Sequence, residues 1–162
     1  MNNKNLENSD LNISEKLKII SEKWEEQNIS IKEILKKSKK TIFYFYPQDN
    51  TPGCTLEAQE FSSNLEKFRD LNIQVFWISR DDLNSHKVFQ DSCSLKIALI
   101  SDSDLKLHKY FWAWWEKNNY WKIVTWVIRS TFLLDENFNI LKEWKNIRAK
   151  WHALRVLKFL EN

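Results

Sequence analysis

The sequence predicts an α/β domain with a central mixed sheet flanked by helices. Short β-branched and aromatic runs indicate strands, and segments with helical spacing of apolar residues separate them. This alternation ends with two consecutive strands and a last helix, a pattern typical of α/β proteins. A length of 162 residues, with 43% hydrophobic and 29% charged residues, suits one such domain.

The first half of the chain begins with a polar, asparagine-rich segment. We expect residues 1 to about 14 to form a disordered tail and residues 15–162 to form the single domain. Strands over Leu17–Ser21 and Asn28–Ile31 are expected to pair as a hairpin. The elements predicted next are a short helix Ile31–Lys37, strand Thr41–Tyr46, helix Cys54–Arg69, strand Ile73–Ser79, helix Leu83–Ser92 and strand Ile97–Ile100.

The last third of the chain is expected to open with a short helix, Leu105–Phe111, and a long loop through Tyr120. Strands over Val127–Leu134 and Ile140–Lys145 then form a predicted hairpin. A final helix over Ala149–Leu160 places its leucines on one face, which predicts that it packs on the sheet.

Charge and composition exclude several classes of protein. The net charge of +3 comes from 25 basic and 22 acidic residues, too balanced for a nucleic-acid-binding surface. We interpret the lysines of Lys36–Lys40 as a helix end and a solvated turn. No apolar run reaches the roughly 18 residues of a membrane span, and the first ten residues lack the pattern of a secretion signal. Two cysteines make no disulfide framework, so we expect a cytoplasmic protein with reduced thiols.

One cysteine, Cys54, stands at the expected start of a helix. The strand before it ends at a turn that contains Pro52 and Gly53. Unpaired backbone N–H groups and the positive end of the helix dipole meet at such a position and favour the thiolate over the thiol. A small buried core cysteine, or an anion site with an incidental cysteine, fits the same spacing.

The residues around Cys54 resemble a motif of the peroxiredoxins, in particular of the bacterioferritin-comigratory or Q-type subgroup. The family hallmark Pro-x-x-x-Thr-x-x-Cys is present as Pro47, Thr51 and Cys54. Further matches in the same order are Ser79, Asp81, Ser85, His86, Phe89, Leu99–Asp102 and Arg129–Asp135. The resemblance runs from about Ile29 to about Leu160. It implies a thioredoxin-like fold and a thiol peroxidase that reduces hydrogen peroxide and organic hydroperoxides in antioxidant defence.

The resemblance also implies roles at the site. Cys54 is expected to attack the peroxide and become a sulfenic acid. The Thr51 hydroxyl and the Arg129 guanidinium would stabilise charge on the departing oxygen. Without the resemblance, Thr51 reads equally well as a helix cap and Arg129 as a surface charge.

Supporting roles follow for three neighbours. Pro47 would shield the thiolate from water, and the backbone N–H of Gly53 would add a donor. Glu57, three residues after the cysteine, would orient the arginine through a salt bridge.

A second thiol must reduce the sulfenic acid again. Many Q-type relatives carry that cysteine five positions after the first, where this chain has Gln59. Cys93, near the end of the helix Leu83–Ser92, is a candidate resolving cysteine; simple packing of its thiol is the alternative. Otherwise an outside thiol reduces Cys54 directly. We expect thioredoxin or a similar thiol donor as the reductant, no cofactor and a monomer.

No metal site is expected, because the chain has three histidines and none is spaced with the cysteines as ligands. We interpret His86 as a helix residue. Its neighbours Asp81, Asp82 and Ser85 are expected to form the solvated start of that helix.

Tryptophan is over-represented and glycine nearly absent. The chain has nine Trp and one Gly, whereas about eleven Gly are usual at this length. The resemblance implies glycine at seven of the tryptophan positions: Trp24, Trp77, Trp112, Trp115, Trp121, Trp126 and Trp151. We hypothesise that the source reads UGA as glycine and that the native protein has Gly at these seven positions.

Two other functions remain open from the sequence. A thiol redox sensor or oxidoreductase on the same fold, without fast peroxide turnover, would use the same cysteine. A non-enzymatic binding module could use the tryptophans as a stacking platform, provided that they are genuine and exposed.

Overall fold

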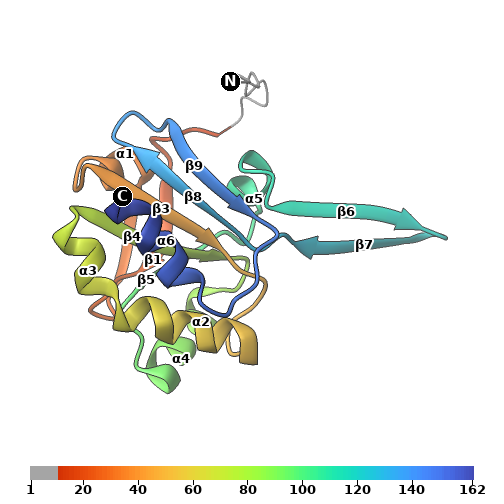
Figure 1. The fold of residues 1–162 in the computed structure, drawn as a ribbon. Helices are drawn as coiled ribbons and strands as arrows, with labels where there is room; N and C mark the ends of the chain where they lie inside the picture. Colours follow the sequence, from red (N-terminus) through yellow and green to blue (C-terminus); the bar gives the residue numbers. More distant parts are fainter. Residues whose placement is uncertain (1–10) are drawn as a thin grey trace.

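The computed structural model describes residues 11–162, and a single mixed sheet of seven strands organises them. The strand order is β2-β1-β5-β4-β3-β8-β9, with β3, β4 and β5 parallel and the outer strands antiparallel. The sheet lies between helices on both faces (Figure 1). The strands are β1 (Lys16–Ile20), β2 (Glu26–Ser30), β3 (Lys40–Phe45), β4 (Ile73–Ser79), β5 (Ala98–Ser101), β6 (Trp114–Asn119), β7 (Lys122–Val127), β8 (Ser130–Asp135) and β9 (Ile140–Lys145).

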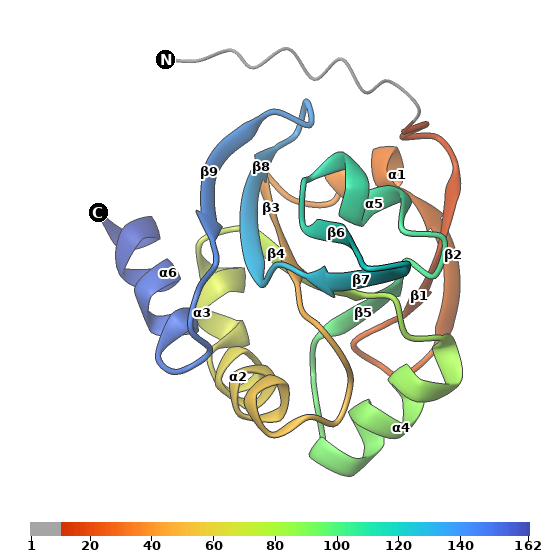
Figure 2. The same ribbon diagram turned by 90° about the vertical axis from the view of Figure 1, so that its right-hand side faces the viewer.

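The helices separate into two groups with two hydrophobic cores. The helices are α1 (Ile31–Leu35), α2 (Pro52–Ser63), α3 (Leu65–Asp70), α4 (Leu83–Cys93), α5 (Lys106–Tyr110) and α6 (His152–Glu161). The first core joins one sheet face to α2, α3, α4 and α6, and the second joins the other face to α1 and α5. Figure 2 shows the sheet between these two layers. The predicted α/β class, with a thioredoxin-like mixed sheet flanked by helices, is confirmed.

The sequence of strand β3 explains its buried place in the sheet. The strand pairs with β4 on one side and β8 on the other, and its two faces are covered by the two hydrophobic cores. Five of its six residues are buried, which explains its continuous run of β-branched and aromatic residues. Because β3 is an interior strand, the loop that follows it leaves the sheet between β4 and β8, and α2 begins there.

Two predicted elements were wrong. The single helix Cys54–Arg69 is two helices, which meet at Asn64. The Asn64 amide donates to the carbonyl of Glu60, and side chains of this kind compete with helical hydrogen bonds. The long loop before Tyr120 is the hairpin β6–β7, which extends away from the body of the protein (Figure 1).

The beginning of the domain also differs from the prediction. Residues 1–10 of the expected disordered tail lie outside the described residues. Leu11 and Ile13 are partly buried against the second core, so the packed chain starts before residue 15.

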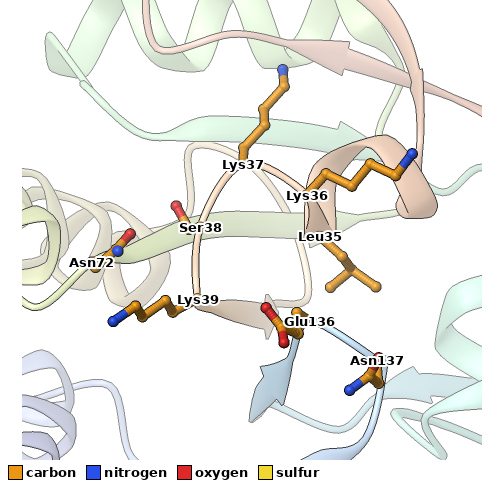
Figure 3. A pocket seen from close by; sticks show the side chains of 8 residues that line it. All are labelled: Leu35, Lys36, Lys37, Ser38, Lys39, Asn72, Glu136 and Asn137. Atoms are coloured by element: carbon orange, nitrogen blue, oxygen red, sulfur yellow. The ribbon is translucent and has the colours of Figure 1, made fainter.

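The lysine-rich turn after α1 is solvated, as expected. It borders a surface cavity of about 500 Å³ at the end of β3 opposite the α2 loop. Figure 3 shows that the side chains of Lys36, Lys37 and Lys39 point in different directions, so they do not converge on a ligand.

Backbone conformation sets four of the seven questioned tryptophans apart. Trp24, Trp112, Trp121 and Trp151 have φ values of 65°, 56°, 70° and 64°. This left-handed region favours glycine, because other residues crowd their Cβ there. No glycine of the described chain has a positive φ.

The surroundings of Trp112 and Trp121 are turn types that use glycine. Trp112 follows α5 in a Schellman motif, since its N–H bonds Lys109 O and the next N–H bonds His108 O. Trp121 is the second residue of the two-residue turn between β6 and β7, and both turn residues have positive φ. Such hairpin turns prefer glycine.

The remaining three tryptophans lie in strands. Trp77 is fully buried in β4, and its indole N–H has no hydrogen-bond partner. The rings of Trp115 and Trp126 oppose each other across the hairpin with centroids 3.4 Å apart. Glycine at all seven positions stays a prediction, which the backbone angles support at the first four. Seven tryptophans in peptide mass spectra from the source organism would refute it.

Candidate active site

Cys54 lies in the first turn of α2, fully buried. Thr51 is the N-cap, Pro52 opens the helix, and Cys54 is the third helical residue. Proline suits the first position because its fixed φ is helical and its missing N–H has no partner there. The expected placement of Cys54 at a helix N-terminus is therefore present, two residues inside the helix rather than at its first residue.

Arg129 brings a positive charge to the cysteine sulfur. It lies between β7 and β8, and its Nη2 is 3.2 Å from Cys54 Sγ. The β8 register against β3 fixes this position, because Phe45 pairs with Ser130, the residue after the arginine. The arginine side chain is 17% exposed, so it links the buried sulfur to the surface.

Glu57 and Tyr44 hold the other side of the guanidinium. Arg129 Nη1 donates to Glu57 Oε2 at 2.7 Å and contacts the Tyr44 hydroxyl at 2.7 Å. Tyr44 in turn donates to the same glutamate oxygen. The predicted salt bridge between Glu57 and Arg129 is present. Tyr44 was missed, because a strand pattern shows that a tyrosine is buried but not what its hydroxyl meets.

Burial changes the ionisation of this cluster. It raises the pKa of Glu57 to about 7, although hydrogen bonds from Tyr44 and Arg129 act in the opposite direction. Burial and the neighbouring Glu57 raise the pKa of Tyr44, so its hydroxyl stays a donor. Burial alone would lower the pKa of Arg129, but Tyr44, Cys54 and Glu57 raise it above its ordinary value. The arginine therefore remains charged.

Three other predicted residues surround the sulfur less directly. The Thr51 hydroxyl donates to the Gln48 carbonyl at 3.2 Å, rather than to Cys54. Gly53 lies close to the arginine, since an added Cβ would come 3.8 Å from Arg129 Nη2. Pro47 is half-buried and directly follows the buried end of the β3 segment.

Cys93 is the last residue of α4 and is partly buried. Its side chain packs against the core cluster that contains Cys54, and both cysteines are free thiols. A hydrogen bond of 3.1 Å from Ser92 to Asn50 joins this end of α4 to the loop before Cys54.

His86 lies in α4, as expected, and is fully buried. The expected solvated start of this helix needs a correction, because Asp82 is exposed but Asp81 and Ser85 are partly buried. The His86 ring contacts Asp49 of the loop between β3 and α2, a partner 37 residues away that no local pattern reveals.

Within residues 11–162, no group of three or more His, Cys, Asp or Glu side chains is arranged to hold a metal ion. None of the helices in this part of the chain has the length and apolar character needed to cross a membrane.

The protein combines a thioredoxin-like sheet with a cysteine in the first turn of a helix, and an arginine contacts the sulfur of that cysteine. This is the structure of a peroxiredoxin, a thiol peroxidase. The chain belongs to the AhpC/TSA family, whose model matches residues 13–143.

Individual relatives agree with this assignment. The chain is 42% identical over 132 residues to a putative peroxiredoxin bcp of Helicobacter pylori, a match that covers 82% of this chain and 86% of the relative. It is 36% identical over 126 residues to peroxiredoxin Bcp of Bacillus subtilis, covering 78% and 80%. Among solved structures, bacterioferritin comigratory protein of Xanthomonas campestris, described for its alkyl peroxide reduction activity, matches with a TM-score of 0.79 and 30% identity. That match covers 92% of this chain and 91% of the other.

Proposed function

We propose that Cys54 is the peroxidatic cysteine of this thiol peroxidase. The contact of Arg129 Nη2 with Cys54 Sγ at a helix N-terminus is the observation that carries this proposal. Both features place positive charge beside the sulfur, and the thiolate is the nucleophile of cysteine chemistry.

In the proposed first step, the thiolate attacks the terminal oxygen of a hydroperoxide. The S–O bond forms and the O–O bond breaks, so the sulfur is oxidised by two electrons and the peroxide is reduced. The product on the enzyme is a sulfenic acid. The alcohol or water oxygen leaves as an anion and takes a proton from solvent, which replaces the proton lost when the thiol ionised.

The arginine would act on the leaving oxygen as well as on the sulfur. Its planar fork has free donors, and fixed donors aimed at developing charge lower a barrier. Glu57 and Tyr44 hold the Nη1 side of the fork, which leaves Nη2 directed at the reacting atoms. In this proposal Thr51 turns its hydroxyl from Gln48 toward the peroxide when substrate binds, the Gly53 N–H adds a donor, and Pro47 limits the entry of water.

Cys93 is proposed to reduce the sulfenic acid again. Its thiolate attacks Cys54 Sγ, the S–S bond forms, and the S–O bond breaks to release hydroxide, which becomes water on protonation. A disulfide requires Cα atoms within about 7 Å, so the loop before Cys54 and the end of α4 must open for this step. Thioredoxin or a similar thiol donor would then reduce the disulfide in a reducing, cytoplasmic setting, with the protein acting as a monomer.

Turnover of hydrogen peroxide and of an alkyl hydroperoxide, coupled to thioredoxin and its reductase, tests this function. The wild-type protein should consume both peroxides, and Cys54→Ser should consume neither. Turnover retained by Cys54→Ser would refute the assignment. Slow oxidation of Cys54 without turnover of either peroxide would instead favour a thiol redox sensor. Cys93→Ser separates the two cycles, because an outside thiol alone would sustain its turnover.

A further inference from the structure

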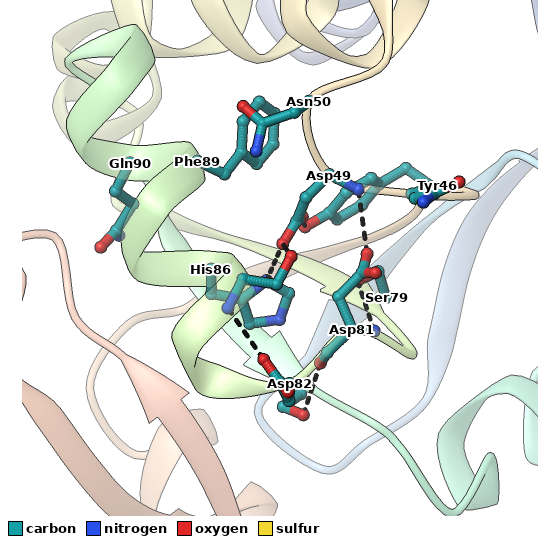
Figure 4. Close-up of polar contacts among 12 residues, drawn as sticks. Tyr46, Asp49, Asn50, Ser79, Asp81, Asp82, His86, Phe89 and Gln90 are labelled. Atoms are coloured by element: carbon teal, nitrogen blue, oxygen red, sulfur yellow. Dashed lines mark hydrogen bonds and ion pairs between the residues drawn. The ribbon is translucent and has the colours of Figure 1, made fainter.

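The loop between β3 and α2 is fastened to α4 through Asp49. This aspartate is 5% exposed, and its carboxylate accepts from the hydroxyls of Tyr46 and Ser85. His86 Nδ1 lies 2.7 Å from the same carboxylate. Figure 4 shows the side chains of Tyr46, Asp49 and His86 converging between the loop and the first turns of α4. The loop that contains Pro47 and Thr51 is therefore held by buried hydrogen bonds.

Both ring nitrogens of His86 have a hydrogen-bonding partner. Its Nδ1 faces the Asp49 carboxylate, and its Nε2 lies 3.1 Å from the carbonyl oxygen of Ile100. The ring of His86 is therefore held at both nitrogens, by the Asp49 loop on one side and by strand β5 on the other.

The other buried histidines differ from His86 in this respect. His108 Nδ1 lies 2.6 Å from Asp102, but its Nε2 has no partner. His152 contacts the Thr131 hydroxyl at 2.7 Å through Nε2, and its Nδ1 has no partner. Only His86 among the three has a partner at both ring nitrogens, and only its aspartate belongs to the loop before Cys54.

Further bonds strengthen the link at both ends of α4. Asp81, at the end of β4, accepts from the backbone N–H of Asp49 at 2.9 Å. At the other end of α4, Ser92 donates to Asn50. The loop is thus joined at two places to the helix that carries Cys93.

We propose, on the basis that Cys54 is the peroxidatic cysteine, that His86 is a positioning residue whose hydrogen bond with Asp49 sets how readily the Cys54 loop opens. In the closed loop the sulfur lies against Arg129 and reacts with peroxide. Opening breaks the hydrogen bond between His86 and Asp49 and frees the sulfenic acid for the resolving thiol. A sulfenic acid held too long in the closed loop meets a second peroxide, which inserts an oxygen and leaves a sulfinic acid and water or an alcohol. The strength of the His86 link therefore divides the sulfenic acid between these two fates.

Hydrogen exchange of the loop amides in His86→Gln is the first test. The Gln amide can reach Ile100 in place of Nε2 but not Asp49, whereas His86→Asn places its amide near Nδ1 and keeps the Asp49 contact. His108→Gln is the matched control, since it removes a buried His–Asp pair elsewhere. We expect amide exchange of residues 48–51 to be roughly tenfold faster in His86→Gln, because hydrogen bonds to charged groups have contributions of this size. We expect His86→Asn to restore most of the protection.

The second readout is the fate of Cys54 during a peroxide titration, followed by intact mass. Loss of the link should lower the sulfinic fraction of His86→Gln at each peroxide concentration relative to wild type and to His108→Gln. Equal loop exchange and equal sulfinic fractions in the two Gln variants would overturn the proposal. If His86→Gln does not fold, Ser85→Ala removes one bond to Asp49, and the same two readouts decide, with smaller expected changes.

These measurements also separate the inference from the proposed function. A wild-type protein whose Cys54 takes up no oxygen from peroxide would refute the peroxidase assignment. The exchange comparison needs no peroxide and decides the role of His86 in holding the loop by itself.

Discussion

The start of α2 contacts Arg129 through Cys54, and the β6–β7 hairpin ends two residues before Arg129 in the chain. Sequence and backbone conformation agree only at the start of α2. At the α2 start, Thr51, Pro52 and Cys54 occupy positions that suit their side chains. In the hairpin, a 99% exposed Trp121 occupies a left-handed turn position. When a residue type does not suit its own backbone conformation, the identity of that residue should be checked before a function is assigned to it.

This contrast bears on the possible binding module. The exposed aromatic residues of the hairpin would form a stacking surface if the tryptophans are native. Glycine at Trp121 and Trp126 would leave a hairpin with an ordinary turn and no such surface. None of the seven questioned tryptophans takes part in the hydrogen bonds that join Arg129 to Cys54 and to Glu57.

Arg129→Lys should give the largest effect on the active-site side of the comparison. Lysine keeps the charge but cannot contact Glu57, Tyr44 and Cys54 at once through a planar fork. We expect kcat/KM for peroxide to fall by roughly 10²–10³-fold, the range for loss of a fixed transition-state donor. Arg69→Lys, at an exposed ion pair remote from the site, is the control and should change kcat/KM little. A fall of less than threefold in Arg129→Lys would contradict the proposed role.

Glu57→Gln should change how stability depends on pH. Glu57 has a pKa of about 7 in the folded protein and 4.5 as a model value, so the folded state holds an extra proton between these values. The contribution of Glu57 to stability is therefore highest below pH 4.5 and falls as pH rises to about 7. Urea unfolding should show the wild type losing about 3 kcal/mol relative to Glu57→Gln across this window, since each pKa unit corresponds to ~1.4 kcal/mol.

The comparison of wild type with Glu57→Gln also cancels the contribution of His152, whose effect on stability has the opposite dependence on pH. Burial lowers the pKa of His152 to about 3, so its contribution is lost as pH falls below 6.5. Both proteins share His152, and the difference between them reports Glu57 alone. A difference that stays constant from pH 4.5 to 7 would contradict the raised pKa.

Trp121→Gly tests the hairpin side and should give the smallest change. The substituted side chain is almost fully exposed, so little buried surface is lost, while the positive φ becomes favourable. We expect the free energy of unfolding to rise by about 1 kcal/mol in a urea titration. Trp114→Gly, in β6 and outside the seven questioned positions, is the matched control and should destabilise the protein. Destabilisation by Trp121→Gly would show that the turn suits tryptophan.

The sequence predicted the elements whose patterns are local. Strand β4 begins and ends where its apolar run does, and α4 differs from its prediction by one residue. The hairpin β6–β7 was missed because its turn carries Tyr120 and Trp121 in place of the usual turn residues. The contacts of Arg129 with Cys54 and Glu57 join residues that are 75 and 72 positions apart, so no local pattern could predict them. Only the family resemblance placed Arg129 at the site.

What the sequence could not show depends on tertiary contacts. Nothing near His86 in the chain indicates that Asp49 and Ile100 lie on either side of its ring. In the same way, the Tyr44 hydroxyl reaches Glu57 only because α2 packs on the face of β3 to which this side chain points. Buried polar partners of this kind need the three-dimensional structure.

The most direct measurement is the intact mass of the reduced protein after rapid mixing with one equivalent of hydrogen peroxide, without added thiol. We predict that the wild type loses two hydrogens as the Cys54–Cys93 disulfide forms, that Cys93→Ser gains one oxygen, and that Cys54→Ser changes neither way. No rapid change in folded wild-type protein, or an unchanged reaction in Cys54→Ser, would contradict the account.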